Sequence, residues 1–274
     1  MSVPAATTPR VPVGYLGPAG SWTHQACIEL YGEDALVPYG REQLFTAFAQ
    51  GRLDRLCVPV TTSVVGATPY LDDVLAMRGA SIVAEYTRTL GYSLLVQPRT
   101  TRAQVKTVLA HPVALQEVKP WLDREMPTVE RRPAASGGAA AEEVAGAAAA
   151  DLAAMGPPAA AQIHGLVALA QGIEEGPHNV TRWWVIGREA PPPTGHDKTS
   201  LRLQASEQAF GSALQTLSPL ASRVLAVYER PGGRTLDAHV YVIDLAGHAA
   251  QEPLKSFLAA NAGFGLLGSY PRRY

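Results

Sequence analysis

Apolar and polar positions along the first two-thirds of the chain follow two alternating periods. Residues 10–18 form a short apolar run broken by glycines, which predicts a strand, and residues 19–32 show helical spacing with Ser21 as a natural N-cap. Residues 42–53 repeat the helical spacing, and residues 54–60 predict a second strand. Because strands and helices alternate, we expect an α/β unit with a largely parallel sheet.

The α/β pattern continues to residue 187, where residues 180–187 close the unit as a strand. Between these parts we expect a polar turn opening a helix at 61–77, strands within 81–98, a helix leading into a strand at 100–112, one helix over 113–126, and two helices flanking a strand or turn in the alanine-rich stretch 134–172.

A different pattern follows a proline-rich linker at residues 188–197. Residues 198–274 show the order strand, helix, strand, strand, helix, strand, which predicts a ferredoxin-like (βαββαβ) sandwich. We therefore expect a mobile tail at residues 1–10, an α/β domain at residues 11–187 and this small domain after the linker. Its open sheet edges favour pairing with a second copy, so a homo-oligomer, either dimer or tetramer, is expected.

Composition and charge exclude several classes of partner and chemistry. A net charge of −1 provides no field to gather nucleic acid or a membrane surface. The two cysteines lie among apolar neighbours, which fits a reducing cytoplasm, and no stretch approaches the roughly 20 apolar residues that span a bilayer. The histidines lack metal-binding spacing and no G-x-S-x-G elbow is present, so we expect no metal, no cofactor and no serine-hydrolase chemistry.

Four segments place hydroxyls or free backbone N–H groups next to predicted strands. The glycine turn 14–21 and Ser136 each open a predicted helix, whose N-terminus favours an anion. Residues 61–63 supply three hydroxyls after a strand, and Thr181 and Arg182 stand at the mouth of a buried strand. Each segment alone is also explained as an ordinary turn or helix cap. Together they suggest a small anionic substrate held by donors.

The sequence resembles prephenate dehydratases, enzymes of phenylalanine biosynthesis, with their C-terminal ACT regulatory domain. The resemblance runs from about residue 11 to the C-terminus and rests on the blocks GYLGPAGSWTHQA, VLAHPVALQEVKPWL, AAAQIHGLVALAQGIEEGPHNVTRWWVIG and LLGSYPR. It implies two α/β lobes like those of periplasmic binding proteins, followed by the ACT domain. The implied reaction is the loss of CO2 and water from prephenate, which gives phenylpyruvate.

The resemblance also implies roles for individual residues. The threonine of the family's T-R-F run is tied most closely to activity and corresponds to Thr181, which is therefore expected to be catalytic. Arg182 follows as a candidate carboxylate clamp, because its planar guanidinium suits bidentate binding. The other residues expected to hold substrate are Asn179, Thr62, Ser63, Ser136, Gly17, Gly20 and Ser21. Phenylalanine is implied as an effector at Gly211, Ala213, Leu214, Arg230 and Pro231, with a purely structural ACT domain as the alternative.

Several pocket positions depart from the family. Thr61 and Thr62 stand where the family has a glutamate and an asparagine, Gly137 stands for a threonine, and Tyr92 and Ser93 stand for a histidine and a cysteine. Two alternatives to the dehydratase therefore stay open. One is a prephenate decarboxylase that leaves the ring hydroxyl in place, and the other is a non-catalytic amino-acid-binding regulator.

Overall fold

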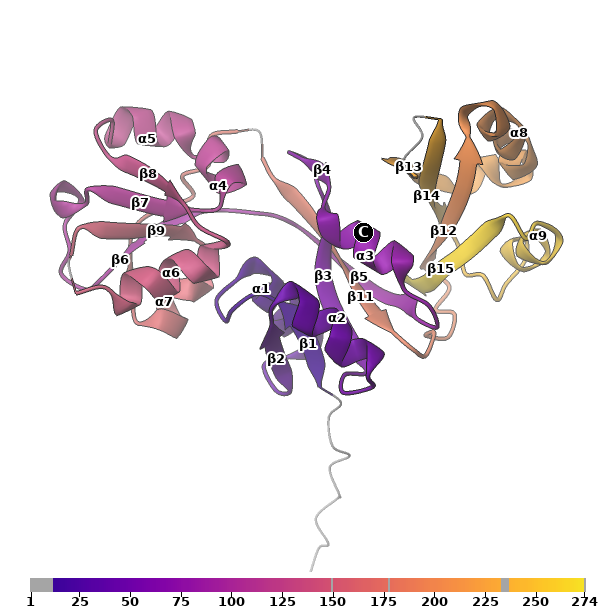
Figure 1. Ribbon diagram of the computed structural model, residues 1–274, viewed down its shortest axis with the longest axis horizontal. Coiled ribbons are helices and arrows are strands. Elements are labelled where there is room, and N and C mark those ends of the chain that lie inside the picture. Colours follow the sequence, from indigo (N-terminus) through magenta and orange to yellow (C-terminus); the bar gives the residue numbers. More distant parts are fainter. Residues whose placement is uncertain (1–11, 149, 177, 233–236, 274) are drawn as a thin grey trace, which may run out of the picture. The chain divides into compact units, whose positions relative to one another are not determined.

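The computed structural model describes residues 12–148, 150–176, 178–232 and 237–273 (Figure 1). The mobile tail expected at residues 1–10 lies outside these ranges. The chain divides into two compact units, one containing the chain through Leu71 together with Tyr86–Trp183, the other containing Asp72–Glu85 and the chain from Trp184 onward. In the described ranges, no helix combines the length and apolar character that a membrane crossing requires.

Six strands form the first sheet: β1 (Val13–Leu16), β2 (Leu36–Tyr39), β3 (Arg55–Thr62), β4 (Gly66–Ala67), β5 (Ser81–Thr89) and β11 (Val180–Gly187). Their order is β2-β1-β3-β11-β5, with β4 paired to β3, and β1 runs parallel to both β2 and β3. The helices of this part are α1 (Trp22–Tyr31), α2 (Arg41–Ala49) and α3 (Pro69–Ala76). The strands and helices expected from the periodicity are thus present, while β2 and β4 were not predicted.

The first strand and helix show why the glycine turn between them matters. Ser21 caps α1 as expected, with its Oγ accepting a hydrogen bond from the backbone N–H of His24 at 3.2 Å. Gly17 has a φ of +99° and Gly20 a φ of +77°, conformations that residues with a Cβ rarely adopt. The chain therefore reverses within a few residues and directs the N-terminus of α1 beyond the carboxyl end of β1.

The second sheet combines β6 (Ser93–Val96), β7 (Thr107–Ala110), β8 (Glu130–Pro133), β9 (Leu152–Gly156) and β10 (Val167–Gln171) in the order β10-β6-β9-β7-β8. Strand β7 is parallel to β8 and β9, whereas β6 is antiparallel to β9 and β10, so the sheet is mixed. Its helices are α4 (Pro112–Glu117), α5 (Lys119–Glu125), α6 (Gly137–Gly146) and α7 (Pro158–His164), after the short 3-10 helix η1 (Arg102–Gln104). Figure 1 shows α4 and α5 on one side of this sheet and α6 and α7 on the other.

The alanine-rich stretch forms the α6–β9–α7 part of this layer. Small side chains such as Ala140, Ala141, Ala154 and Ala160 are fully buried together with Leu109. A Cβ added at Gly156 would lie 2.9 Å from the backbone oxygen of Gly137, so the strand end and the helix start approach backbone to backbone. The predicted pair of helices flanking a strand is confirmed. Strand β10 is an additional strand that the alanine-rich sequence did not predict.

The single helix expected over 113–126 is wrong, because the structure contains two helices, α4 and α5, meeting at Val118. Pro120 occupies the first turn of α5, where its missing N–H costs nothing, whereas inside a continuous helix it would remove a hydrogen bond. The break places Glu117 at the end of α4, and its side chain is fully buried.

The second unit contains an antiparallel sheet in the order β13-β14-β12-β15. Its elements are β12 (Asp197–Ser206), α8 (Glu207–Leu217), the 3-10 helix η2 (Ser218–Arg223), β13 (Val224–Pro231), β14 (Ala238–Ala246), α9 (Leu254–Ala260) and β15 (Phe264–Pro271). The core between the sheet and the helices includes Leu201, Ile243, Leu245 and Leu254. This element order and strand order are those of the predicted ferredoxin-like βαββαβ fold.

Candidate functional site

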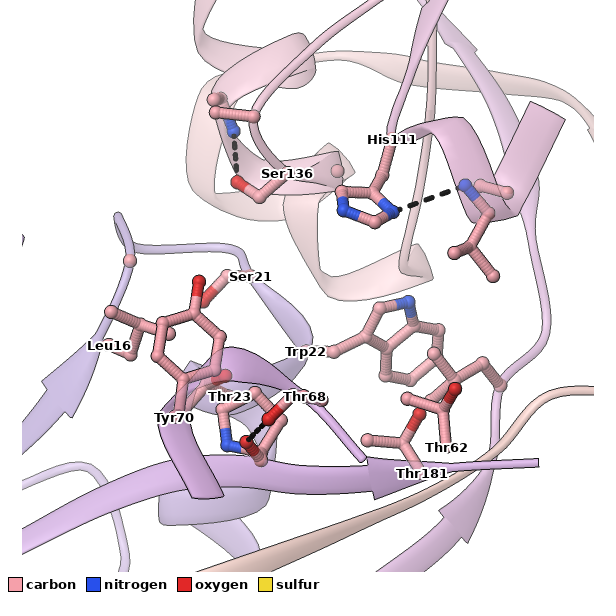
Figure 2. A pocket seen from close by; sticks show the side chains of 18 of the residues that line it. Leu16, Ser21, Trp22, Thr23, Thr62, Thr68, Tyr70, His111, Ser136 and Thr181 are labelled. Carbon is pink, nitrogen blue, oxygen red and sulfur yellow. Dashed lines mark hydrogen bonds between the residues drawn. The ribbon is translucent and has the colours of Figure 1, made fainter. Parts of the chain in front are cut away.

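A cavity of about 690 Å³ lies in the first unit and is lined by residues from both of its sheets. Figure 2 shows His111 and Ser136 on one side of the space, with Tyr70, Thr62 and Thr181 on the other. Of the residues expected to hold substrate, the lining contains Gly17, Ser21, Thr62, Ser136, Asn179 and Thr181. Gly20, Ser63 and Arg182 are not part of it.

Two helix N-termini meet at this cavity. A Cβ added at Gly138, in the first turn of α6, would lie 2.9 Å from the backbone nitrogen of Ser21 at the start of α1. The N-caps Ser21 and Ser136 accept hydrogen bonds from backbone N–H groups of their own helices, at 3.2 Å from His24 and 3.0 Å from Ala139. A serine hydroxyl that accepts as a cap keeps its proton for a ligand, so both caps are able to donate into the cavity. The positive ends of two helix dipoles add to this preference for an anion.

Strand β11 directs alternate side chains to opposite faces. Thr181 and Trp183 line the cavity, and the intervening Arg182 is buried, 4% exposed, and absent from the lining. The structure therefore does not place Arg182 at this cavity, where a clamp for a substrate carboxylate was expected, because neighbouring side chains on a strand point to opposite faces. The Thr181 hydroxyl donates to Asn179 Oδ1 at 3.2 Å.

The hydroxyls after β3 have different positions. Thr62 lines the cavity and its Oγ1 accepts from the backbone N–H of Val65 at 3.1 Å. Ser63 instead ties two chain segments together, since its Oγ donates to the carbonyl of His178 and accepts from the N–H of Val180, both at 2.9 Å. Ser63 thus fixes the segment that carries Asn179 and Thr181 without contacting the cavity itself.

Arg41 is a lining residue that sequence reasoning missed. It begins α2, its guanidinium lies 5.5 Å from the centre of the Tyr70 ring, and it donates to the carbonyl of Pro69 at 3.3 Å. Had strand β2 been recognised, Arg41 would have been a candidate, because it follows the carboxyl end of that strand. A guanidinium in the wall offers a carboxylate a charged, planar partner.

His111 lines the cavity as the N-cap of α4, and its Nδ1 accepts from the backbone N–H of Val113 at 3.3 Å. Burial lowers the pKa of the His111 imidazole, which favours the neutral ring at pH 7. This side chain therefore contributes a polar edge rather than a fixed positive charge.

A buried polar cluster lies behind the cavity wall. Glu117 is 0% exposed, and its carboxylate accepts from the Tyr92 hydroxyl at 3.3 Å and from the backbone N–H of Asn179 at 3.2 Å. Burial, with a smaller contribution from the charge of Glu174, raises the pKa of Glu117 from 4.5 to about 7. Tyr92 and Asn179 both line the cavity, so this carboxyl is one residue removed from the cavity. The periodicity gave no signal for Glu117, which appeared as an ordinary polar position in a predicted helix.

The residues expected to bind an effector lie on two elements of the second unit. Gly211, Ala213 and Leu214 are on α8, where Leu214 is 43% exposed. Arg230 and Pro231 end β13, and the Arg230 guanidinium is paired with the carboxylate of Asp72. Arg230 thus has an ionic partner within its own unit.

The sequence of this chain is similar to those of known proteins over most of its length. A model of the family described as Prephenate dehydratase matches residues 13–191. The prephenate dehydratase of Mycobacterium tuberculosis (strain H37Rv) is 34% identical, over 95% of this chain and 87% of that protein, and the enzyme of Mycolicibacterium vanbaalenii is 33% identical, over 94% and 90%.

Among solved structures, the prephenate dehydratase of Arthrobacter aurescens in complex with L-Phe superposes with a TM-score of 0.83 at 27% identity, covering 96% of this chain and 90% of that one. A protein described as GqqA, a novel type of quorum quenching acylase, has a TM-score of 0.82 at 23% identity, covering 94% and 97%, and shares the fold. The family match over most of the chain and the curated relatives show that this chain belongs to the prephenate dehydratase family of lyases.

Proposed function

We propose that this chain converts prephenate to phenylpyruvate by combined decarboxylation and dehydration, and so acts in phenylalanine biosynthesis. Family membership supports this proposal, and so does the presence of two helix N-termini and Arg41 at one cavity. The bond from the ring to its carboxylate breaks and releases CO2, while its electron pair completes the aromatic ring. The ring C–O bond breaks, and the departing hydroxide takes one proton, supplied in the end by solvent, to become water.

In this proposal the site fixes two carboxylates and stabilises the leaving hydroxide. Ser21 and Ser136 with the N-termini of α1 and α6 hold one anionic group, and Arg41 holds the other. Thr181, 3% exposed in the cavity wall, donates a hydrogen bond to the departing hydroxyl. Aromatisation drives the reaction, so orientation of the substrate and a single well-placed hydrogen-bond donor are sufficient for catalysis. The observation that carries the proposal is the convergence of Ser21, Ser136 and Thr181 on one cavity.

The test is product analysis with purified protein and prephenate. Thr181→Val keeps the side-chain shape and removes the hydroxyl, and should lower kcat by roughly 10²- to 10³-fold, the usual effect of removing one such donor. Thr181→Ser, which keeps a hydroxyl, is the matched control and should stay within about tenfold of wild type. An unchanged kcat in Thr181→Val would contradict the catalytic role.

A second candidate reaction is decarboxylation without loss of the hydroxyl. It is favoured by Thr62, a lining residue where the family has an asparagine, and by Thr61 in place of its glutamate. The same assay separates the two reactions, because phenylpyruvate is aromatic and the decarboxylated alcohol is not. Tight binding of prephenate or phenylalanine with no product of either kind would instead identify a non-catalytic regulator.

The proposal includes regulation and assembly through residues 198–274, which we assign as an ACT domain that binds phenylalanine. The L-Phe complex of the Arthrobacter aurescens enzyme supports this assignment. Leu214, Leu225 and Val227 expose apolar side chains on this ferredoxin-like fold, as an oligomer contact would require. A cytoplasmic location completes the proposal, and the buried, unbridged Cys27 and Cys57 are compatible with it. Calorimetric titration with phenylalanine, together with sedimentation analysis, tests both effector binding and self-association.

A further inference from the structure

The indole N–H of Trp22 is a hydrogen-bond donor in the cavity wall that the proposed reaction has not yet used. Trp22 is the first residue of α1 and lines the cavity. Its Nε1 atom is buried and has no hydrogen-bond partner among the described residues. The indole of Trp183 also lines the cavity but differs in this respect, because its Nε1 donates to Thr23 Oγ1 at 3.1 Å. A buried N–H without a partner is rare in folded proteins and destabilises them, so it calls for an explanation.

The Trp22 N–H is placed where a ligand in the cavity would supply the missing acceptor. Figure 2 shows the indole between the side of the cavity that carries His111 and Ser136 and the side that carries Thr62 and Thr181, with its nitrogen on the edge toward His111. The Trp22 side chain as a whole is only half-buried, so a small turn of the ring about its Cβ–Cγ bond is enough to bring the N–H to a ligand. Because this donor has no protein partner to give up, a hydrogen bond formed with a ligand breaks no other.

The proposed reaction leaves one group of the substrate for this donor. Prephenate carries two carboxylates, a ring hydroxyl and a ketone in its side chain. In the proposed function the helix N-termini and Arg41 hold the carboxylates and Thr181 donates to the hydroxyl, so the ketone oxygen has no donor yet. A ketone oxygen only accepts hydrogen bonds and an indole N–H only donates them, so the two groups match.

The charges of the cavity wall favour a ketone over an amine in the side chain of the ligand. None of the described residues that line the cavity is an aspartate or a glutamate, and Arg41 adds a positive charge. An ammonium group in place of the ketone would find no carboxylate in this wall, and its own N–H donors would face that of Trp22. We propose that Trp22 is a specificity-determining residue whose N–H donates to the ketone oxygen of prephenate and selects this 2-oxo acid over its 2-amino analogue; this inference rests on the dehydratase function proposed above.

The first test compares kcat/KM of the full chain for prephenate and for the analogue in which an ammonium group replaces the ketone. Trp22→Phe keeps an aromatic ring and removes the N–H, and should lower kcat/KM for prephenate by about tenfold, the effect of losing one hydrogen bond. It should change kcat/KM for the amine little, so the preference of wild type for prephenate should fall by about tenfold. An unchanged preference, or an equal loss with both substrates, would overturn the proposal.

Trp121→Phe is the matched control for this substitution. Trp121 lies on α5 outside the lining, and the guanidinium carbon of Arg102 lies 5.3 Å from the centre of its ring, as that of Arg88 lies 5.4 Å from the ring of Trp22. Both variants therefore weaken the same kind of contact. Trp121→Phe should leave the preference between the substrates unchanged, and Trp22→Phe should lower the midpoint of urea unfolding no more than this control does. A larger loss of stability in Trp22→Phe would mean that the N–H has a structural partner, and would also overturn the proposal.

Binding of the product separates this inference from the proposed reaction. Phenylpyruvate carries the ketone and 3-phenylpropanoate lacks it, so calorimetric titration of both ligands requires no turnover. Trp22→Phe should weaken the binding of phenylpyruvate by about tenfold and leave that of 3-phenylpropanoate unchanged. Equal changes for both ligands, or no binding of phenylpyruvate to wild type, contradict the role of Trp22. Absence of phenylpyruvate from wild type incubated with prephenate rejects the proposed function, whereas turnover with an unchanged preference in Trp22→Phe rejects this inference alone.

Discussion

The α-carbon of Gly138 faces the backbone of Ser21 so closely that a Cβ added there would lie 2.9 Å from the Ser21 nitrogen and 3.0 Å from the carbonyl oxygen of Ala19. Both contacts are with backbone, which has little freedom to move aside. The N-termini of α1 and α6 are therefore held together by a position that only glycine fits. In the proposed function, this contact brings together the two helix N-termini that hold an anionic group of the substrate.

Gly138→Ala should separate the two helix N-termini. We expect a loss of stability of about 1–3 kcal/mol from overpacking, with an increase in KM for prephenate. Gly146→Ala is the matched control on the same helix, because a Cβ at Gly146 meets nothing within 4 Å. That variant should be neutral or stabilising by about 0.4–1 kcal/mol through the unfolded state. Urea unfolding and steady-state kinetics measure both effects, and equal behaviour of the two variants would contradict the role assigned to Gly138.

We expect Arg41 to contribute to substrate binding, although the sequence did not identify it as a binding residue. Arg41→Gln removes the guanidinium in the cavity wall, and we expect KM for prephenate to rise by about tenfold or more, since a charge-assisted hydrogen bond contributes about 1.5–3 kcal/mol. Arg52→Gln, an exposed position that follows α2, makes the same change in net charge and should leave KM unchanged. If both variants raise KM alike, the effect is one of overall charge and Arg41 is not a binding residue.

Much of the fold could be predicted from the periodicity of the sequence. Where the sequence did not predict which residues lie at the cavity, there are physical reasons. Strand β11 is buried on both faces, with Trp183 and Trp184 each 1% exposed, so its pattern carried no information about which of Thr181 and Arg182 faces a ligand. Strand β2 was missed because it is short and contains Pro38, and Arg41 was missed with it. The meeting of Ser21 with Gly138 depends on residues more than a hundred positions apart, which local patterns do not relate.

The pH dependence of stability should report the burial of Glu117 independently of activity. The pKa of Glu117 is raised from 4.5 to about 7 in the folded protein, so between these values the folded state holds a proton that the unfolded state has released. Stability from this group is therefore full below about pH 4.5 and falls as pH rises to about 7, by roughly 3 kcal/mol in all. Glu117→Gln should lose this dependence and gain relative to wild type at pH 8. Urea unfolding at pH 6 and pH 8 measures the difference, and parallel changes in both proteins would show that Glu117 titrates normally.

The ion pair between Lys198 and Glu85 should be a strong determinant of stability in the second unit. Lys198 Nζ lies 2.6 Å from Glu85 Oε1, and the two side chains are 4% and 0% exposed. Removing one partner breaks a buried ion pair, so Lys198→Met and Glu85→Leu are each expected to destabilise the fold, Lys198→Met by about 3–5 kcal/mol. The double variant Lys198→Met with Glu85→Leu removes both charges and should lose less stability than the sum of the two single losses, because the two charges stabilise one another. Thermal and urea unfolding of the single and double variants form a double-mutant cycle. Additive losses would mean that the two side chains do not stabilise one another.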